Sequence, residues 1–329
     1  MLTKIKIRGL FNVYDYNIDL TNEDGSMVKF ITAPNGYGKT TILDFIEAVM
    51  CQTYGKMFSI PFELFELYYD EPSSDVMYIY TVTREDTKSV SSDTDVVQTL
   101  SKKLNIKLQR INGSDEKLIE QFSVKQTSED TISTEGSDDN IQMFFVSRTC
   151  FYLTDQRALL QKKDVMEVVD EVLVIDERPI VPYPKELKNI LESPVMSQEY
   201  ESRISAFREI INRCEFANKH LEIDKRFGFR FVSDDELHTI LTLDQLSSGE
   251  KQMVIQVYEL LFRAQSGTLV MIDEPELSLH MMWQMNYLKN LSEISQLRGF
   301  QCIVATHSPQ IFNSLWSKSV DLFTLSNQE

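Results

Sequence analysis

The spacing of apolar residues near the start of the chain changes from the period of a strand to that of a helix. Within residues 4–8, lysine and arginine alternate with isoleucine, and a second apolar run, VKFIT, covers residues 28–32 before a glycine-rich turn. From Thr40 to Met50 the apolar residues recur with helical spacing. We therefore predict two or three short strands in residues 1–32 and a helix directly after the turn.

The middle of the chain is polar and predicts strands first and helices afterwards. Three β-like segments in residues 72–145 read YIYTVTRE, KLNIKLQRI and LIEQFSVKQ, which favours antiparallel strands. The spacers at 87–95 and 128–140 are rich in Ser, Thr, Asp and Glu and are typical of exposed loops. Residues 155–225 have a helical pattern, in which one apolar stripe extends from Ser197 to Glu222.

Residues 241–329 alternate between strand-like and helix-like segments. Two apolar strands, TLVMID and QCIVATH, flank a helix that is predicted from Met281 to Gln296. This alternation favours a parallel sheet with helices packed on it. The predicted fold class is α/β, with a mixed central sheet flanked by helices, an antiparallel β-subdomain and a short helical insertion. We expect one domain over residues 1–329, composed of an N-terminal half (1–155), a helical insertion (156–240) and a C-terminal half (241–329).

The chain of 329 residues carries a formal net charge of −17, which lowers the expectation of non-specific nucleic-acid binding. Such a charge repels phosphates at long range, although a local basic patch can still bind them. Lys102, Lys103, Lys107 and Arg110 are one candidate patch, and a solvated face of a strand or helix is the alternative. DNA binding therefore stays open at this stage.

The sequence gives no sign of a membrane segment or of an oxidising compartment. It contains no run of about 18 apolar residues, and its first residues lack the apolar stretch and cleavage site of a signal peptide. Cys51, Cys150, Cys214 and Cys302 are far apart in the sequence, and the histidines lack metal-ligand spacing. We therefore expect reduced thiols in a cytoplasmic protein that makes no contact with a membrane.

The turn that follows the second apolar run has the composition of a phosphate-binding loop. Residues 33–40 read APNGYGKT, which matches G-x-x-x-x-G-K-[ST] except that Ala33 replaces the first glycine. The two inner glycines let several N–H groups converge, and Lys39 adds a positive charge for the β- and γ-phosphates. The hydroxyl of Thr40 suits Mg²⁺. The expected nucleotide contacts are Asn35, Gly36, Tyr37, Gly38, Lys39, Thr40 and Thr41.

A predicted buried strand ends in two adjacent acids. Residues 269–275 read LVMIDEP, and α/β sheets bind their ligands at the carboxyl ends of the strands. Asp273 is expected to lie near Mg²⁺, and Glu274 is expected to polarise the attacking water as a general base. A strand end with two solvated acids is the alternative interpretation.

A serine-rich segment precedes this strand, where residues 246–252 read LSSGEKQ. Small residues allow close approach there, and a helix that begins with a serine hydroxyl is a site for anions. By itself the segment resembles any serine-capped helix, so its significance comes from its place before the Asp-Glu strand.

The order of these motifs resembles that of the ABC ATPases. In that family a phosphate-binding loop, an L-S-x-G-[EQ] segment, a strand ending in Asp-Glu and a strand ending in His follow one another. The segment APNGYGKTT looks like the loop of the SMC, RecF and OLD branch, and DEPELSLH at 273–280, followed by Trp283 and Gln284, is similar to the OLD-like ATPases. Such ATPases recur in bacterial anti-phage systems such as Septu, PARIS and certain retrons. The resemblance covers about residues 1–50, 141–160 and 210–315.

The resemblance implies roles for further residues. Gln156 matches the Q-loop glutamine that senses Mg²⁺ and the attacking water, with Gln142 as a weaker candidate. His307 matches the switch histidine that faces the γ-phosphate, and residues 277–280 match the D-loop at a dimer seam. The signature residues, which in the family reach the γ-phosphate bound to the opposite protomer, correspond to Ser247, Ser248 and Gly249.

Several positions depart from the family pattern. Ala33 replaces a glycine and Met281 replaces the usual proline, and neither position must touch phosphate. His280 stands where transporter-type ATPases carry Asp, whereas the OLD-like branch uses this His. Residues 12–14 are a possible adenine contact by analogy, and core or turn residues are the alternative.

If the family geometry holds, the signature segment cannot reach the loop of its own chain, and two heads sandwich two ATP molecules. ATP then closes a homodimer or a higher homo-oligomer, and loss of the γ-phosphate releases it. About 90 residues separate Gln156 from Leu246, too few for a DNA-tethering arm at about 1.5 Å per helical residue. The chain also stops soon after His307, which leaves no room for the TOPRIM domain of fused OLD nucleases.

The resemblance therefore implies ATP and Mg²⁺ as cofactors of an ATPase that regulates a separate effector, possibly a nuclease or a toxin, in anti-phage defence. One alternative is a RecF-like clamp that binds DNA in repair, which the acidic charge disfavours. The other is a scaffold that binds ATP with little turnover, which the presence of both Asp273 and Glu274 disfavours.

Overall fold

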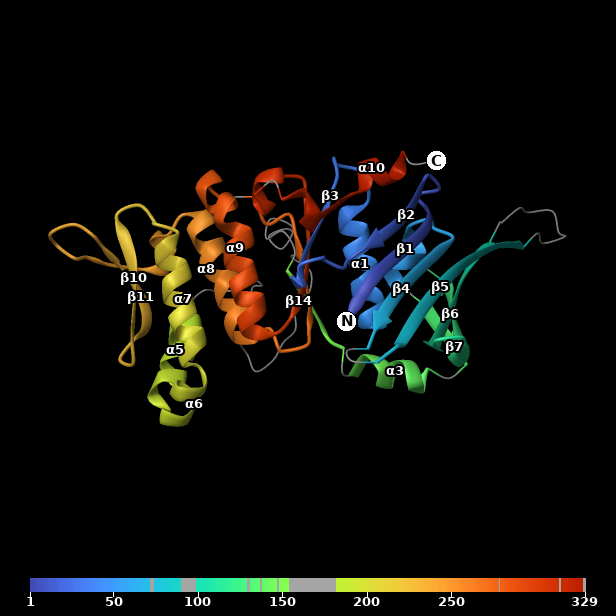
Figure 1. The fold of residues 1–329 in the computed structure, drawn as a ribbon, viewed down its shortest axis with the longest axis horizontal. Helices are drawn as coiled ribbons and strands as arrows, with labels where there is room; N and C mark the ends of the chain where they lie inside the picture. Colours follow the sequence, from blue (N-terminus) through green and yellow to red (C-terminus); the bar gives the residue numbers. More distant parts are fainter. Residues whose placement is uncertain are drawn as a thin grey trace.

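A computed structural model describes most of the chain, and Figure 1 shows its arrangement. Parallel strands lie in the middle of the molecule, with helix α1 and an antiparallel sheet on one side and helices α5 to α9 on the other (Figure 1). The described residues are 1–71, 74–89, 99–128, 131–136, 138–146, 148–153, 182–277, 279–313 and 315–327.

The central sheet has five parallel strands in the order β15-β3-β14-β13-β9. Every residue of β3, β13 and β14 is buried, because both faces of the sheet are covered by other elements, and this explains their nearly continuous apolar sequences. The bounds are β3 (Val28–Thr32), β9 (Cys150–Leu153), β13 (Leu269–Asp273), β14 (Gln301–Thr306) and β15 (Ser319–Asp321). The parallel sheet predicted from strand–helix alternation is therefore confirmed.

The two faces of this sheet belong to different hydrophobic cores. Helix α1 (Lys39–Met50) packs in one core together with the antiparallel sheet, whereas α8 (Ser248–Tyr258) and α9 (Met281–Arg298) pack in the other. Neighbouring residues of the central strands alternate between the two cores, as the pleat requires. One face carries Ile31, Met271 and Ile303, and the other carries Phe30, Ile272 and Val304.

The second sheet is antiparallel and has the strand order β2-β1-β4-β5-β6-β7-β8. Its strands are β1 (Leu2–Leu10), β2 (Tyr14–Asp19), β4 (Leu64–Asp70), β5 (Val76–Ser89), β6 (Thr99–Asn112), β7 (Asp115–Ser128) and β8 (Thr131–Glu135). These bounds confirm the antiparallel strands that were predicted within residues 72–145, and β1 to β3 are the strands predicted in residues 1–32. The short helix α2 (Gly55–Ser59) precedes β4.

The prediction of a loop at 128–140 is wrong for most of that spacer. Residues Thr131–Glu135 form the edge strand β8, and α3 (Asp139–Val146) begins within the same range. All five residues of β8 are exposed, so the strand has no apolar face that would distinguish it from a loop.

The helical stripe predicted from Ser197 to Glu222 also ends earlier than expected. The structure has α5 (Pro182–Glu192), α6 (Pro194–Glu199) and α7 (Glu201–Arg213), followed by strand β10 (Lys219–Asp224). Glu215 and Asn218 between them have φ of 48° and 55°, a left-handed backbone that stops the helix. Strands β11 (Gly228–Ser233) and β12 (Ile240–Leu241) complete a small sheet that the sequence pattern did not predict.

The remaining helices follow the predicted order. Helix α8 continues as a π-helical turn (Glu259–Arg263), and α9 covers the predicted helix and ends at Gly299, whose φ is 68°. Short 3-10 turns lie at Leu243–Gln245, Pro309–Phe312 and Trp316–Lys318, and α10 is Leu322–Ser326. No helix of the described ranges is long and apolar enough to cross a membrane.

Two expectations about side chains are also modified. Lys103 and Lys107 alternate along β6 with the buried Leu104 and Ile106, whereas the ammonium of Lys102 donates to the Phe58 carbonyl on the other face. The four-residue basic patch is therefore divided between two faces. All four cysteines are free thiols, as expected, but the Sγ atoms of Cys51 and Cys150 lie 3.6 Å apart despite their distance in the sequence.

Candidate functional site

The glycine-rich loop connects β3 to α1 at the carboxyl edge of the parallel sheet. Gly36 and Gly38 have φ of 91° and 86°, which L side chains rarely adopt. A Cβ atom on Gly38 would also lie 2.7 Å from Cδ2 of Leu10, so the loop packs directly against the end of β1. The strand–loop–helix context that a phosphate-binding loop requires is therefore present.

The side chain of Lys39 is folded into this loop. It is 5% exposed, and its ammonium donates hydrogen bonds to the carbonyl oxygens of Ala33 (2.9 Å) and Pro34 (3.3 Å). A buried cation surrounded by neutral carbonyl groups favours an anion nearby. Among the other predicted contacts, Asn35 and Gly36 are exposed, whereas Tyr37 and Thr41 are half-buried.

Thr40 and Asp273 lie in contact although 233 positions separate them in the sequence. The hydroxyl of Thr40 donates to Oδ2 of Asp273 at 2.7 Å, while Oδ1 of Asp273 is buried and has no hydrogen-bond partner in the described chain. Burial raises the pKa of Asp273 to about 6; the hydrogen bond from Thr40 opposes this rise and the neighbouring charge of Glu274 adds to it. The structure therefore brings together the two residues that the sequence assigns to Mg²⁺.

The oxygen atoms of Thr40 and Asp273 fit a bound Mg²⁺. Hydroxyl and carboxylate oxygens are its preferred ligands, and the unpartnered Oδ1 of Asp273 is a free acceptor at this point. No cluster of three or more His, Cys, Asp and Glu side chains suited to a metal occurs in the described ranges. A site with few protein ligands is typical of Mg²⁺ that is shared with nucleotide phosphates.

The raised pKa of Asp273 leads to a testable pH dependence. Because its pKa in the fold lies above the ordinary 3.8, ionised Asp273 destabilises the nucleotide-free protein above about pH 6, and the effect disappears towards pH 4. Asp273→Asn should therefore stabilise the nucleotide-free fold at pH 8 by up to about 3 kcal/mol, roughly 5 °C in Tm. The gain should vanish near pH 4.

Thermal unfolding of both proteins between pH 4 and pH 8 measures this difference. With Mg²⁺ and ATP the order should reverse, because the variant lacks the second carboxylate oxygen for the metal. A Tm difference that is independent of pH would contradict the account of Asp273.

Glu274 and His307 meet at the ends of the neighbouring strands β13 and β14. Glu274 has a φ of 45°, and its N–H donates to the Ala305 carbonyl at 2.8 Å. One carboxylate oxygen of Glu274 lies 3.8 Å from Nδ1 of His307, and both side chains are partly exposed. The left-handed backbone turns Glu274 out of the strand beside Asp273, as a group that acts on a ligand at the strand ends requires.

Glu276 is a residue of this site that the sequence analysis missed. Its side chain is buried, and Oε1 accepts hydrogen bonds from the Thr306 hydroxyl (2.6 Å) and from the His307 N–H (2.9 Å). The same oxygen lies 3.0 Å from Nδ1 of His307. The only available signal was a further acid two positions after Glu274, which by itself says nothing about its partners.

The serine-rich segment forms the start of α8. Ser247 is its N-cap and makes a capping box with Glu250: the Glu250 N–H donates to the serine hydroxyl (3.3 Å), and the Ser247 N–H donates to the Glu250 carboxylate (2.8 Å). Lys219 pairs with the same carboxylate at 2.9 Å. Ser247 and Ser248 are exposed, while Gly249 is buried. The segment is thus a serine-capped helix with outward-facing hydroxyl groups.

Figure 1 places helix α8, which this segment begins, and helix α1, which follows the glycine-rich loop, on opposite sides of the parallel strands. Helix α8 belongs to the core that contains Phe30 and Val304, whereas α1 belongs to the core that contains Ile31 and Ala305. The structure therefore brings Lys39, Thr40 and Asp273 together but carries the serine turn on the other layer.

The remaining candidates have different outcomes. Gln156 and Ser278 lie outside the described residues. Gln142 is exposed on α3, which packs against β7 of the antiparallel sheet and not at the strand ends near Asp273. The turn at residues 12–14 lies against the glycine-rich loop, since the rings of Tyr14 and Tyr37 stack at 5.3 Å.

The parallel sheet, the glycine-rich loop and the strand-end acids define a P-loop ATPase of the ABC type. Residues 34–313 match the family described as "AAA domain, putative AbiEii toxin, Type IV TA system", and the chain belongs to this family.

Three individual proteins show similarity to the chain. The "Retron Ec83 probable ATPase" of Escherichia coli is 32% identical over 97 residues, which cover 26% of this chain and 18% of that protein. The crystal structure of an SMC head bound to the C-winged helix domain of ScpA has a TM-score of 0.48 at 12% identity, covering 94% of this chain and 90% of that chain. The SMC head domain from Thermotoga maritima has a TM-score of 0.43 at 14% identity, covering 95% and 91%.

Proposed function

We propose that the protein is a Mg²⁺-dependent ATPase in which ATP brings two copies together and thereby regulates a separate effector. The observation that carries this proposal is the hydrogen bond from Thr40 to Asp273, which joins the glycine-rich loop to the end of β13. A loop hydroxyl and a strand-end carboxylate in contact are the protein ligands that Mg²⁺·ATP sites use.

The glycine-rich loop and Asp273 bind different parts of the nucleotide complex. The ammonium of Lys39 leaves its carbonyl partners for the β- and γ-phosphates, which the N–H groups of residues 35–41 surround. Thr40 and Asp273 would hold Mg²⁺. The metal would supply positive charge that offsets the charge of the phosphates.

The groups at the strand ends act on the attacking water. Glu274 is partly exposed and stands next to Asp273, so it takes the proton of a water that approaches the γ-phosphate. His307, on the neighbouring strand end, contacts the γ-phosphate itself. By resemblance, Gln156 is a further contact of the water and of the metal.

The serine turn supports an arrangement of two copies. The hydroxyl oxygen of Ser247 accepts the Glu250 N–H, so the hydroxyl proton remains available for a phosphate oxygen. Ser248 and the N–H of Gly249 add donors at the same helix end. Because α8 and α1 cover opposite faces of the sheet, we propose that a second copy supplies this turn, in a homodimer or higher homo-oligomer.

The effector and the biological setting are inferred from the relatives. The description of the matched family names a putative toxin of a toxin–antitoxin system, and the retron protein that aligns with this chain is named a probable ATPase. These names favour an ATPase that restrains or activates a toxic partner, such as a nuclease, in anti-phage defence. The partner is proposed to be a separate protein.

Phosphate release from ATP by the purified protein tests the enzymatic part of this proposal. We expect turnover with Mg²⁺ and none with EDTA. Binding of ATP without any release of phosphate would instead support the scaffold interpretation.

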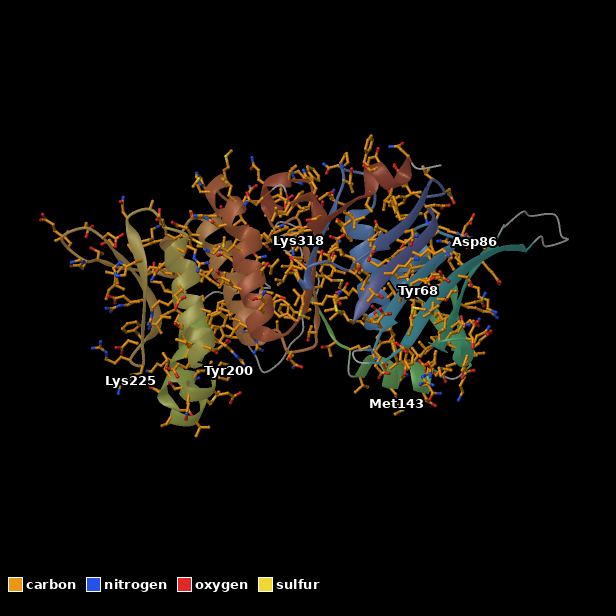
Figure 2. All side chains as sticks on the ribbon, in the orientation of Figure 1. Tyr68, Asp86, Met143, Tyr200, Lys225 and Lys318 are labelled. Atoms are coloured by element: carbon orange, nitrogen blue, oxygen red, sulfur yellow. The ribbon has the colours of Figure 1, made fainter. Side chains whose placement is uncertain are left out.

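A second candidate function is a clamp that responds to DNA. A surface cavity of about 390 Å³ on the antiparallel sheet is lined by three cations of β1, Lys4, Lys6 and Arg8, together with one acid, Asp15, and uncharged residues. Lys4 lies 5.2 Å from the ring centroid of Tyr68, which Figure 2 labels on this sheet, and Lys6 pairs with Glu66 at 3.3 Å. This local positive face favours phosphodiester groups despite the acidic net charge.

If the protein is such a clamp, double-stranded DNA should raise the ATPase rate roughly 3- to 10-fold in low salt. A Lys6→Glu/Arg8→Glu variant should not show this increase. The basal rate without DNA should be the same in both proteins, because neither residue belongs to the strand-end site. An ATPase rate that DNA leaves unchanged in the unmodified protein would reject the clamp.

A further inference from the structure

A buried carboxylate lies directly beneath the histidine at the end of β14. Glu276 is 6% exposed, and its Oε1 accepts the Thr306 hydroxyl and the His307 N–H and lies 3.0 Å from Nδ1 of His307. The backbone N–H of His307 is thus hydrogen-bonded to this carboxylate oxygen, and its ring lies in contact with the same atom. This arrangement fixes the position of the ring relative to β14.

The surroundings of Glu276 are unusual for an acid with a purely structural role. Its second oxygen, Oε2, is buried and has no hydrogen-bond partner in the described chain. Within the described residues, Glu276 forms an ion-pair contact with a histidine, His307. Another buried acid, Glu259, instead pairs with an arginine, Arg263. Burial of an acid with an incomplete set of partners costs free energy, and such costs persist mainly where a function depends on them.

The contact bears on which nitrogen of His307 carries a proton. A carboxylate oxygen presents only acceptor lone pairs, so its position 3.0 Å from Nδ1 favours a proton on that nitrogen. The other ring nitrogen, Nε2, then lies on the far side of the ring, and the side chain of His307 is 43% exposed. The carboxylate keeps Nδ1 on its own side, so that Nε2 points away from it, and a ring with a proton on each nitrogen donates from Nε2 to an oxygen.

The two acids near His307 are suited to different tasks. Glu274 lies farther from Nδ1, at 3.8 Å, and its side chain is 26% exposed, which leaves its carboxylate free for water. Glu276 is enclosed and directed at the histidine. Burial thus separates the two acids: Glu274 is partly exposed to solvent, and Glu276 is enclosed beside the ring.

We propose that Glu276 is a positioning residue of the ATPase reaction, which holds Nδ1 of His307 on its own side so that Nε2–H is directed at the γ-phosphate. This inference rests on the proposed function, since it assigns the way in which one residue of that site is oriented. Glu276 acts through His307 and touches neither the nucleotide nor the water.

Steady-state kinetics of Glu276→Ala test the role in turnover. We expect kcat to fall roughly 10- to 100-fold with KM changed less than about 3-fold, because the histidine acts mainly in the transition state. Glu276→Gln, which retains an acceptor oxygen, should restore part of the loss. In a His307→Ala background, Glu276→Ala should lower kcat no further, because the two residues act as one unit.

The matched control is Glu259→Ala, which removes a buried acid that lies between the core residues Tyr258 and Leu260 and pairs with Arg263. It should lower the melting temperature at least as much as Glu276→Ala but leave kcat unchanged. Independent, multiplicative losses of kcat for Glu276→Ala and His307→Ala would overturn the proposal. So would an unchanged kcat in Glu276→Ala.

A readout without turnover separates this inference from the proposed function. In the ¹⁵N spectrum of histidine-labelled protein, the His307 signal, assigned from its loss in His307→Ala, should show a protonated Nδ1. Glu276→Ala should shift the ring towards the Nε2-protonated tautomer. The same tautomer in both proteins overturns the inference even if ATP is hydrolysed, whereas the expected shift upholds the Glu276–His307 contact even if the protein releases no phosphate.

Discussion

Replacement of Lys39 by alanine is expected to weaken nucleotide binding severely. The ammonium is buried in the glycine-rich loop, and within the described part of the chain its hydrogen-bond partners are the carbonyl oxygens of Ala33 and Pro34. Loss of a charged hydrogen-bond donor to phosphate costs about 3 kcal/mol, which weakens the Kd for Mg²⁺·ATP by roughly 100-fold or more. Titration calorimetry with ATP measures this change directly.

The matched control for this variant is Lys188→Ala, which removes an exposed lysine paired with Glu192 on α5. It should bind ATP like the unmodified protein. If Lys39→Ala retained the Kd of the unmodified protein while remaining folded, the loop would not be the phosphate site.

The second large effect is expected for Glu274→Gln, which should bind ATP but trap the closed dimer. The glutamine keeps the shape of the side chain beside Asp273 but cannot take a proton from water, so kcat should fall by about 10²- to 10⁴-fold. With hydrolysis blocked, the γ-phosphate continues to join the two copies. Light scattering after size exclusion with Mg²⁺·ATP should therefore give the mass of two chains.

Glu293→Gln serves as the control, because this exposed acid pairs with Arg213 on the surface of α9. It should keep the activity of the unmodified protein and form no more dimer. A Glu274→Gln protein that remained monomeric in millimolar ATP would contradict the proposed switch.

The parts of the fold that depend on local sequence were predicted well. The glycine-rich loop was recognisable because Gly36 and Gly38 lie between an apolar run and a helical pattern within a short stretch of sequence. In the structure both glycines have the left-handed backbone that favours this residue. Strand β13 was equally clear, since a fully buried parallel strand has a continuous apolar sequence that ends where the acids begin.

The errors occurred where local pattern and three-dimensional packing differ. Phe216 and Leu221 continue the helical spacing and are buried in the same core as α7, yet the chain between Arg213 and Lys219 turns through a left-handed backbone and returns as a strand. Strand β8 has no buried face, so its sequence resembles a loop. Periodicity reports which residues are buried but not which element buries them.

The role of Glu276 could not be derived from the sequence because its partners are on another strand. Thr306 and His307 follow Glu276 by about thirty positions, and only the parallel pairing of β13 with β14 brings them together. The Cys51–Cys150 contact is hidden for the same reason. In contrast, Thr40 and Asp273 could be grouped in advance, because the chemistry of Mg²⁺·ATP requires both.

The account depends on a serine turn from one copy meeting the glycine-rich loop of another across a shared nucleotide. Mass and bound nucleotide should be measured together for Glu274→Gln and for Glu274→Gln/Ser247→Arg in Mg²⁺·ATP. We predict that the arginine introduced at position 247, at the exposed end of helix α8, leaves each monomer loaded with ATP but unable to dimerise. An ATP-bound dimer in the double variant, or a loss of ATP from its monomers, would contradict it.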